Sequence, residues 1–516
     1  MFPVINLKET GIIFEELWIL LLDFMEFLEA TFISLTAKSF VILFLVKRKK
    51  CNYKLQKSYD KCYYTNKSHR TFVCAEADMY RVIFDELIKW KDSKRRKPLM
   101  ITGVRQCGKT YVLKELGGQY FENTCYINFE SNSNYVSIFD FDFDVNRIVN
   151  EIELIQKTTI VPGKTLLIFD EIQECPKAIT SLKYFCENLP ELHLVCAGSL
   201  LGVALKQDNI SFPVGKVNRM QMYPMSFKEF VIAMGEERYI SLFAKWDVNR
   251  MIPEGYRGPM EKLLKTYFAV GGMPEVVRDY IMNKDFQIVT EIQDEILSDY
   301  ADDFSKHAPV AEIEKLRMIW ESIPKQLAKD NNKFVFSHVK EGKRAHELEA
   351  SLGWLKNAGL IHILELVQNA EIPLSFNADA TYFKVYMSDI GLLSRRLGIP
   401  ANDYMSENDT LKTSKGAITE NYVMNELLYQ KKIPYYWKSG NTAEVDFIYE
   451  NKGDVIPVEV KAATNTQAKS YKQFSKKYEP KSGFKASFKN IAVNKVNETD
   501  TVNIPLYLLW NMDFYV

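Results

Sequence analysis

The sequence has few cysteines, no net charge and no long apolar run, and each shortage excludes a class of protein. Its eight cysteines among 516 residues form no CxxC pair and no histidine-interleaved spacing that would bind zinc. A disulfide framework would also be unusual in a chain this long. We therefore expect eight free thiols and a reducing, cytoplasmic location.

The charges of the chain balance. Lys plus Arg and Asp plus Glu both number 66, so the formal net charge is zero. No global basic field exists to attract nucleic acid or anionic lipid, and binding to DNA would need a local basic patch. Hydrophobic residues make up 47% of the chain, which is enough for folded cores. Because domains usually hold about 100 to 200 residues, we expect several of them.

Residues 1–78 form an N-terminal extension of uncertain purpose. The segment from Leu17 to Val46 is strongly apolar, but charged residues interrupt it, and its longest uncharged runs are eight residues long. A membrane span needs about 18 such residues, so a membrane anchor is less favoured than a dispensable extension. A well-patterned segment begins at Met79, which resembles a second start of the protein.

The first motif with chemical meaning is GVRQCGKT at 103–110, between a predicted buried strand at 98–102 and a predicted helix at 111–116. It is a phosphate-binding loop, GxxxxGKT, in the strand–loop–helix setting that this loop needs. Lys109 is expected to reach the β and γ phosphates of ATP, and the Thr110 hydroxyl to bind Mg²⁺. The expected ATP contacts in the loop are Gly103, Val104, Arg105, Gln106, Cys107, Gly108, Lys109 and Thr110.

A second predicted buried strand, TLLIF at 165–169, ends in two carboxylates sixty residues after Thr110. Asp170 is expected to bind the hydrated Mg²⁺, and Glu171 to polarise the water that attacks the γ phosphate. A third apolar strand at 192–197 leads to Ser199, which is expected either to contact the γ phosphate or to cap a turn. Together these patterns predict an ATP-binding site with Mg²⁺ as cofactor.

From Met79 onward the chain resembles bacterial and archaeal ATPases of the AAA superfamily whose C-terminal domain is similar to a PD-(D/E)xK nuclease. Seven segments carry the resemblance: GVRQCGKT (103–110), LLIFDEIQ (166–173), CAGSLLG (196–202), YPMSFKEF (223–230), YFAVGGMPEVV (267–277), MSDIGLL (387–393) and EVDFIYENKGDVIPVEVKA (444–462). Family members commonly have Gly-Arg where this chain has Gly215-Lys216, with Arg219 three residues later. Because Lys lacks the planar fork of Arg, an arginine finger from a neighbouring subunit is in doubt.

We expect an α/β protein with four domains after the extension. These are a P-loop AAA-type core (79–245), a helical lid (246–308), a winged-helix-like domain (309–400) and a restriction-endonuclease-like α/β domain (401–516). The winged-helix expectation rests on helices at 312–328 and 345–358, a short strand at 333–339 and a two-stranded ribbon at 360–367 and 381–387. Lys340, Lys343 and Arg344 would meet phosphates there, or the module is a spacer that packs against protein.

The C-terminal segment predicts a hairpin with carboxylates on one face. If Glu450 pairs with Val455 across the turn at 451–454, Asp446 faces Glu459 and Glu444 faces Lys461. Directly opposed carboxylates repel each other, and a divalent metal, Mg²⁺ or Mn²⁺, would relieve the repulsion. Lys461 would hold the attacking water and Glu420, on a predicted helix at 416–431, would add a ligand. The alternatives are an exposed sheet face with a Glu444–Lys461 ion pair, or a nuclease-like fold that binds without cutting.

The expected function is therefore ATP hydrolysis coupled to the engagement of DNA, with metal-dependent nuclease activity as its less certain part. The rival is a nucleotide-controlled switch or scaffold with a degenerate nuclease-like domain. ATP is the expected ligand, DNA and further copies of the chain are candidate partners, and a membrane is not expected.

Overall fold

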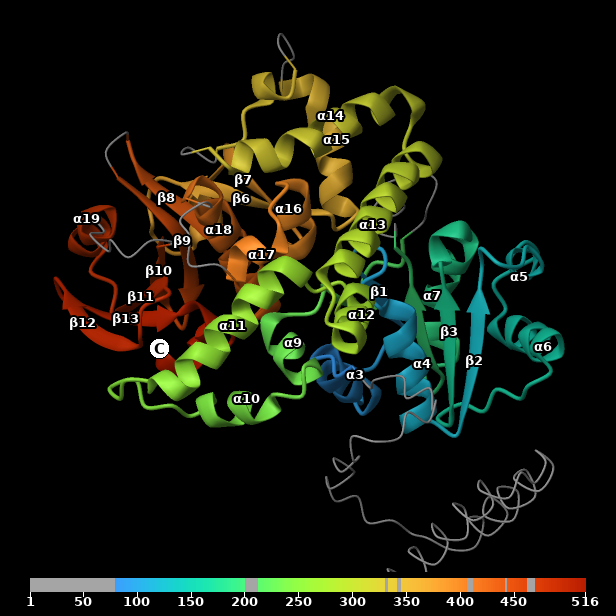
Figure 1. Ribbon diagram of the computed structural model, residues 1–516. Coiled ribbons are helices and arrows are strands. Elements are labelled where there is room, and N and C mark those ends of the chain that lie inside the picture. Colours follow the sequence, from blue (N-terminus) through green and yellow to red (C-terminus); the bar gives the residue numbers. More distant parts are fainter. Residues whose placement is uncertain are drawn as a thin grey trace, which may run out of the picture. The chain divides into compact units, whose positions relative to one another are not determined.

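The computed structural model describes residues 79–199, 212–329, 333–340, 345–405, 412–440, 443–461 and 469–516 (Figure 1). The N-terminal extension and three of its cysteines lie outside these ranges. The five cysteines within them, at 107, 125, 175, 186 and 196, are free thiols, as predicted. In this part of the chain, no helix is both long enough and apolar enough to cross a bilayer.

The first part of the described chain is a parallel five-stranded sheet in the order β2-β3-β4-β1-β5. Alternate residues of its strands enter two apolar clusters, one on each face, which is why strands such as TLLIFD are apolar almost throughout. The strands are β1 (Leu99–Thr102), β2 (Asn123–Asn128), β3 (Thr165–Asp170), β4 (His193–Ala197) and β5 (Asn218–Gln221). The helices are α3 (Ile83–Lys91), α4 (Lys109–Tyr120), α5 (Asn134–Ser137), α6 (Val145–Gln156), α7 (Pro176–Asn188) and the short η1 (Ile172–Glu174).

Helices follow this sheet as far as residue 327. They are α9 (Phe227–Ala233), α10 (Glu237–Phe243), α11 (Glu254–Val270), α12 (Pro274–Asn283), α13 (Phe286–His307) and α14 (Val310–Leu327). The turn between α11 and α12 packs tightly, since a Cβ on Gly272 would lie 2.1 Å from the backbone oxygen of Met225. This turn therefore lies against the chain that follows β5.

The rest of the chain forms one eight-stranded sheet in the order β12-β13-β11-β10-β9-β8-β6-β7 (Figure 1). Its strands are β6 (Ile361–Val367), β7 (Ala378–Met387), β8 (Tyr435–Ser439), β9 (Ala443–Asn451), β10 (Asp454–Lys461), β11 (Ser482–Ser487), β12 (Ala492–Val496) and β13 (Thr499–Pro505). The helical segments are η2 (Phe336–His338), α15 (Ala345–Asn357), η3 (Leu374–Asn377), α16 (Ile390–Arg396), α17 (Ala401–Met405), α18 (Lys412–Tyr429), α19 (Lys469–Tyr478) and η5 (Leu506–Tyr515).

The middle segment differs from the sequence expectation in two ways. The strand predicted at 333–339 is wrong: it contains one bridge, from Lys333 to Lys384, and then the η2 turn. The predicted ribbon is present as β6 and β7, but β6 also pairs in parallel with β8. The expected division at residue 400 therefore cuts across a continuous sheet. Short-range patterns predict the ribbon but not its parallel partner, which lies about seventy residues later.

The C-terminal hairpin has the predicted register. Five pairs between β9 and β10, from Asn451–Asp454 to Phe447–Val458, follow the pairing of Glu450 with Val455. The turn is tighter than expected, because only Lys452 and Gly453 lie between the paired strands. Both have positive φ, at 48° and 82°, which is typical of a two-residue hairpin turn.

Candidate functional site

The P-loop folds over the start of α4 and lines a cavity of about 380 Å³. Gly108 precedes the helix with φ of 93°, a conformation that favours glycine, so the chain can turn directly into the helix. Lys109, the first residue of α4, is only 7% exposed. Its Nζ donates to the backbone oxygens of Gly103 and Val104, both at 2.9 Å. The ammonium group is thus fixed inside the loop by neutral partners.

The end of β3 meets the start of α4, as the spacing predicts. Thr110 Oγ1 donates to Asp170 Oδ2 at 2.7 Å, and the Tyr126 hydroxyl donates to the same oxygen at 2.7 Å. A threonine hydroxyl beside a carboxylate is a hard oxygen donor pair of the kind that Mg²⁺ prefers. These residues therefore fit a magnesium ion that accompanies a nucleotide.

Glu171 lies next to this pair in a strained backbone conformation. Its φ of 49° and ψ of 44° are left-handed, which costs a non-glycine residue about 1 to 2 kcal/mol. Gln173 Nε2 donates to Glu171 Oε2 at 2.6 Å, and the backbone N and Oγ of Ser199 lie 3.4 Å from that oxygen. Ser199 thus holds the carboxylate of Glu171, a contact that the sequence did not predict.

The residues predicted for the nucleotide site, including the magnesium and water contacts, divide into two groups. One group lines the cavity and consists of Arg105, Gln106, Gly108, Lys109, Thr110, Glu171 and Ser199. The other group does not line it and consists of Gly103, Val104, Cys107 and Asp170. Cys107 is fully buried, with Sγ 3.9 Å from the backbone oxygen of Met222, so its side chain serves packing.

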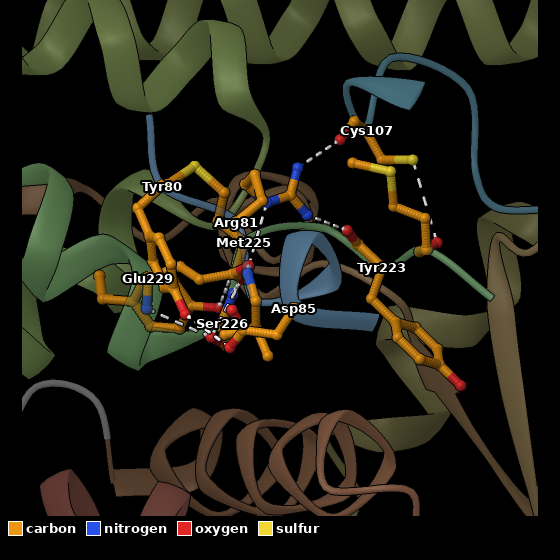
Figure 2. A network of polar contacts seen from close by, with 11 residues as sticks. Tyr80, Arg81, Asp85, Cys107, Tyr223, Met225, Ser226 and Glu229 are labelled. Carbon is orange, nitrogen blue, oxygen red and sulfur yellow. Dashed lines mark hydrogen bonds and ion pairs between the residues drawn. The ribbon is translucent and has the colours of Figure 1, made fainter. Parts of the chain in front are cut away.

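Arg81 anchors the P-loop to the chain that follows β5, a role that sequence reasoning missed (Figure 2). Its guanidinium donates to the backbone oxygens of Cys107 and Tyr223, at 2.7 and 2.6 Å, and to Glu229 Oε1 at 3.1 Å. Glu229 also completes the capping box at the start of α9 with Ser226. Because Arg81 is only 3% exposed, these charge-assisted bonds form away from solvent. Its only local sign is its position two residues before a helix.

The helices that follow the sheet also contact the P-loop. Arg105 Nη1 pairs with Asp303 Oδ1 at 2.6 Å, and Gln106 Nε2 donates to Asp299 Oδ2 at 2.7 Å, both acceptors being on α13. Burial raises the pKa of Asp303, and the charge of Arg105 opposes that shift. Arg278 of α12 lines the same cavity and was also missed by sequence reasoning. The loop is thus bonded to α13, and α12 borders the cavity.

Lys216 and Arg219 lie outside the cavity. Lys216 pairs with Glu187 at 2.8 Å, and Arg219 lies over the ring of Phe212 at 4.2 Å. Neither residue completes the nucleotide site of its own chain.

The C-terminal carboxylates gather on one face of the large sheet. Asp446 Oδ2 accepts from the backbone N of Val460 at 2.7 Å, which places Asp446 beside the strand that carries Glu459 and Lys461. Lys461 Nζ pairs with Glu459 Oε1 at 2.7 Å, whereas Glu459 Oε2 is buried and finds no donor among the described residues. Burial, then the charge of Glu459, raises the pKa of Asp446 well above its usual value, and burial likewise raises the pKa of Glu459. The carboxyl groups of Asp446 and Glu459 thus lie in one buried patch, in which Lys461 is paired with Glu459.

A buried lysine that the sequence did not reveal joins this cluster. Lys384 of β7 is 2% exposed, and its Nζ lies 2.7 Å from Glu444 Oε1 and 3.7 Å from Glu420 Oε2. The Tyr386 hydroxyl also donates to Glu420 Oε2, at 3.1 Å. Glu444 therefore pairs with Lys384 and Lys438 rather than with Lys461, which corrects that alternative.

The carboxylates of this cluster could bind a divalent ion only together with ligands that the protein does not supply, namely water and a substrate phosphate. Across the described ranges, no group of three or more His, Cys, Asp or Glu side chains could hold a metal ion. Glu420 already has contacts to Lys384 and Tyr386, and Lys461 pairs with one oxygen of Glu459. The acceptors that remain beside each other are the carboxylate of Asp446 and the second oxygen of Glu459. Mg²⁺ is commonly bound by one or two carboxylates together with water and substrate phosphate.

Comparison with known families assigns the first of these sites. Residues 95–231 match the family model of an AAA domain. Residues 95–231 thus form an AAA-type P-loop domain. The matched segment contains the loop, the two carboxylates at the end of β3 and Ser199, so it includes the core of the cavity described above.

Two further family models follow the AAA domain. Residues 261–403 match a domain of unknown function, DUF8612, and residues 415–509 match another, DUF4143. The first match spans the expected boundary at 308 between the lid and the winged-helix-like domain. Among curated proteins no match was found.

Several solved structures are similar to parts of the chain. The Walker-type ATPase PABY2304 of Pyrococcus abyssi is 16% identical with a TM-score of 0.39, over 60% of this chain and 94% of that one. The ORC2 protein of Aeropyrum pernix is 12% identical with a TM-score of 0.30, over 64% and 95%. The ORC1 protein of Aeropyrum pernix in complex with DNA is 12% identical with a TM-score of 0.26, over 63% and 92%.

Proposed function

We propose that the chain binds ATP together with Mg²⁺ at the AAA domain and hydrolyses its γ phosphate. The observation that carries this proposal is the contact between Thr110 and Asp170, with Lys109 and Glu171 on the same cavity. Lys109 supplies a buried positive charge to the phosphates, and the loop N–H groups orient them. Magnesium, when bound, would neutralise developing negative charge beside Thr110 and Asp170.

Glu171 is the proposed general base. Its carboxylate lines the cavity, and Gln173 and Ser199 hold one of its oxygens. A carboxylate held in this way can accept a hydrogen bond from water and direct it toward the γ phosphate. Ser199 is then a positioning residue that acts through Glu171.

Two substitutions test this proposal. Lys109→Ala should abolish ATP binding, because the cavity loses its buried charge. Glu171→Gln should keep ATP binding and reduce hydrolysis by about a hundredfold or more, because only proton abstraction is lost. Nucleotide binding by calorimetry and phosphate release are the measurements, with the exposed Lys183→Ala as the matched control. Undiminished ATP turnover in Lys109→Ala would contradict the proposal.

A second function is proposed for the C-terminal cluster, namely metal-dependent cleavage of phosphodiester bonds. It is supported by the Asp446–Glu459 repulsion and by the buried Glu459 oxygen without a donor among the described residues. Lys461 has a raised pKa, because the charges of Glu459 and Asp446 outweigh the effect of burial. It therefore stays protonated, and its role is to orient water and stabilise negative charge rather than to accept a proton.

The full-length chain without nucleotide is suited to test this second function. Manganese binding by calorimetry should be present in the wild type and lost when Asp446→Asn and Glu459→Gln are combined. Lys461→Ala should keep the metal and stop cleavage. If the wild type and the double variant give the same binding isotherm, the nuclease interpretation fails and the switch is favoured.

The effect of DNA on ATP turnover distinguishes a DNA-coupled ATPase from a nucleotide-controlled switch. DNA should increase the rate of phosphate release if the two ends of the chain work together. A switch would hold nucleotide and turn it over slowly whether or not DNA is present. We further propose a cytoplasmic location and self-association, the latter testable by sedimentation with and without ATP.

A further inference from the structure

A second cavity opens on the same large sheet, separate from the nucleotide site. It has a volume of about 290 Å³ and is lined by residues from β6, β7, β8, β9 and the segment before η2. Its cationic lining residues are Lys333, Lys384 and Lys438, and its acidic one is Glu444. Three ammonium groups and one carboxylate give the wall an excess of positive charge.

The lysines of this cavity differ in how their charge is compensated. Lys384 is neutralised by Glu444 and by Glu420 at its back. Lys438 lies 3.6 Å from the other Glu444 oxygen, so the two lysines share one carboxylate. Lys333 lies over the ring of Tyr382 at 3.7 Å, and burial, then the charge of Lys438, lowers its pKa. An anion in the cavity would relieve the repulsion between Lys333 and Lys438.

The cavity adjoins the carboxylate cluster. Lys384 and Glu444 belong to both, and Asp446 lies two residues beyond Glu444 on the same face of β9. Tyr382 of the lining is 42% exposed, so an aromatic ring is also available beside the lysines. Lysines with an aromatic ring are the combination that proteins use to hold single-stranded nucleic acid.

We propose that this cavity binds a backbone phosphate of a single-stranded nucleic acid and so places the strand beside Asp446 and Glu459. Lys333 and Lys438 bind the phosphate, and Tyr382 contacts the adjacent sugar or base. The inference rests on the proposed nuclease function and adds the class of substrate and the residues that hold it.

The test is fluorescence anisotropy of a labelled single-stranded oligonucleotide with the full-length chain, without divalent metal. Lys333→Ala combined with Lys438→Ala should weaken binding about tenfold and reduce the slope of log affinity against log salt by about 0.7, because one phosphate contact is lost. Lys477→Ala combined with Lys495→Ala is the charge-matched control at exposed positions of α19 and of the distant edge strand β12, and should change affinity less than twofold. Equal melting temperatures would confirm that both double variants fold.

Three results would overturn the inference. The first is unchanged affinity and salt slope in the cavity variant, and the second is an equal loss in the control. The third is a deoxynucleoside monophosphate that binds as tightly as the strand with the same dependence on Lys333, since the site would then select a free nucleotide. Manganese binding at Asp446 and Glu459 is measured separately, so a failed phosphate site leaves the result for the metal intact.

Discussion

At the scale of single residues, Arg81 joins the P-loop to the chain that follows β5. Three acceptors depend on its buried guanidinium, namely the oxygens of Cys107, Tyr223 and Glu229. Arg81→Met should lower stability by about 3 to 5 kcal/mol, because it leaves the carboxylate of Glu229 buried without its partner. The exposed Arg238→Met is the matched control. Thermal melting measures the effect, and an unchanged melting temperature would contradict the anchoring role.

Glu426 of α18 provides a prediction about pH. Its Oε1 accepts from the backbone N of Phe227 at 3.0 Å, and burial raises its pKa to about 8. A carboxyl with a raised pKa binds more protons in the folded state than in the unfolded state. Stability is therefore lost as the pH rises from about 4.5 to about 8.

Glu426→Gln removes this titrating group and keeps an oxygen for Phe227. The melting temperature of the wild type should fall more steeply than that of the variant across the same pH window. Parallel melting curves for the two proteins across that window would show that Glu426 does not ionise there.

The residues of the candidate sites were predictable where one motif or one hairpin contained them. The P-loop spacing predicted Lys109 and Thr110, and hairpin register brought Asp446 close to Glu459. Arg81 and Lys384 were not predictable, because each reaches its partners through tertiary packing from a segment without a motif. A buried cation in a pattern of apolar strand residues has no sequence signal of its own.

At the scale of elements, the turn between α11 and α12 is the tightest junction described above. The backbone N of Gly272 donates to Asp389 Oδ2 at 2.7 Å, and an added Cβ would lie 2.1 Å from the Met225 oxygen. Gly272→Ala should therefore destabilise the protein by about 1 to 3 kcal/mol, since backbone must move to make room.

Gly258→Ala, within α11, is the matched control. Its Cβ would meet no atom closer than 3.6 Å, so the change should raise stability by about 0.5 to 1 kcal/mol. Thermal melting of both variants gives the comparison. A Gly272→Ala protein as stable as the control would mean that the turn is not constrained.

Elements with strong local patterns were predicted correctly from the sequence. The strand predicted at 333–339 is wrong for a physical reason. Apolar residues in that segment pack against β7 through Phe334 and Phe336, whose rings contact Phe383. An alternating apolar pattern predicts burial correctly here, but it cannot distinguish a strand from an irregular segment that lies against a sheet.

At the scale of the whole molecule, every residue that lines the nucleotide cavity lies between Met79 and Arg278. Met79 and Arg81 line the nucleotide cavity, so a chain that begins at Met79 retains every described residue of that site. We expect this shortened protein to be soluble and to match the full chain in melting temperature and ATP turnover. Aggregation or lost turnover in the shortened protein alone would show that the extension belongs to the fold.

The continuous sheet from β6 to β13 limits how the protein can be divided. A fragment that begins at residue 401 would lose β6, and the hydrogen-bonding groups of β8 that pair with it would face solvent. Unpaired strand edges promote intermolecular pairing and amyloid-like association. A cut ahead of α15 and β6, at residue 345 or earlier, keeps the ribbon with its sheet. The insolubility of a fragment cut at residue 401 would then reflect the position of the cut rather than an intrinsic instability of the C-terminal fold.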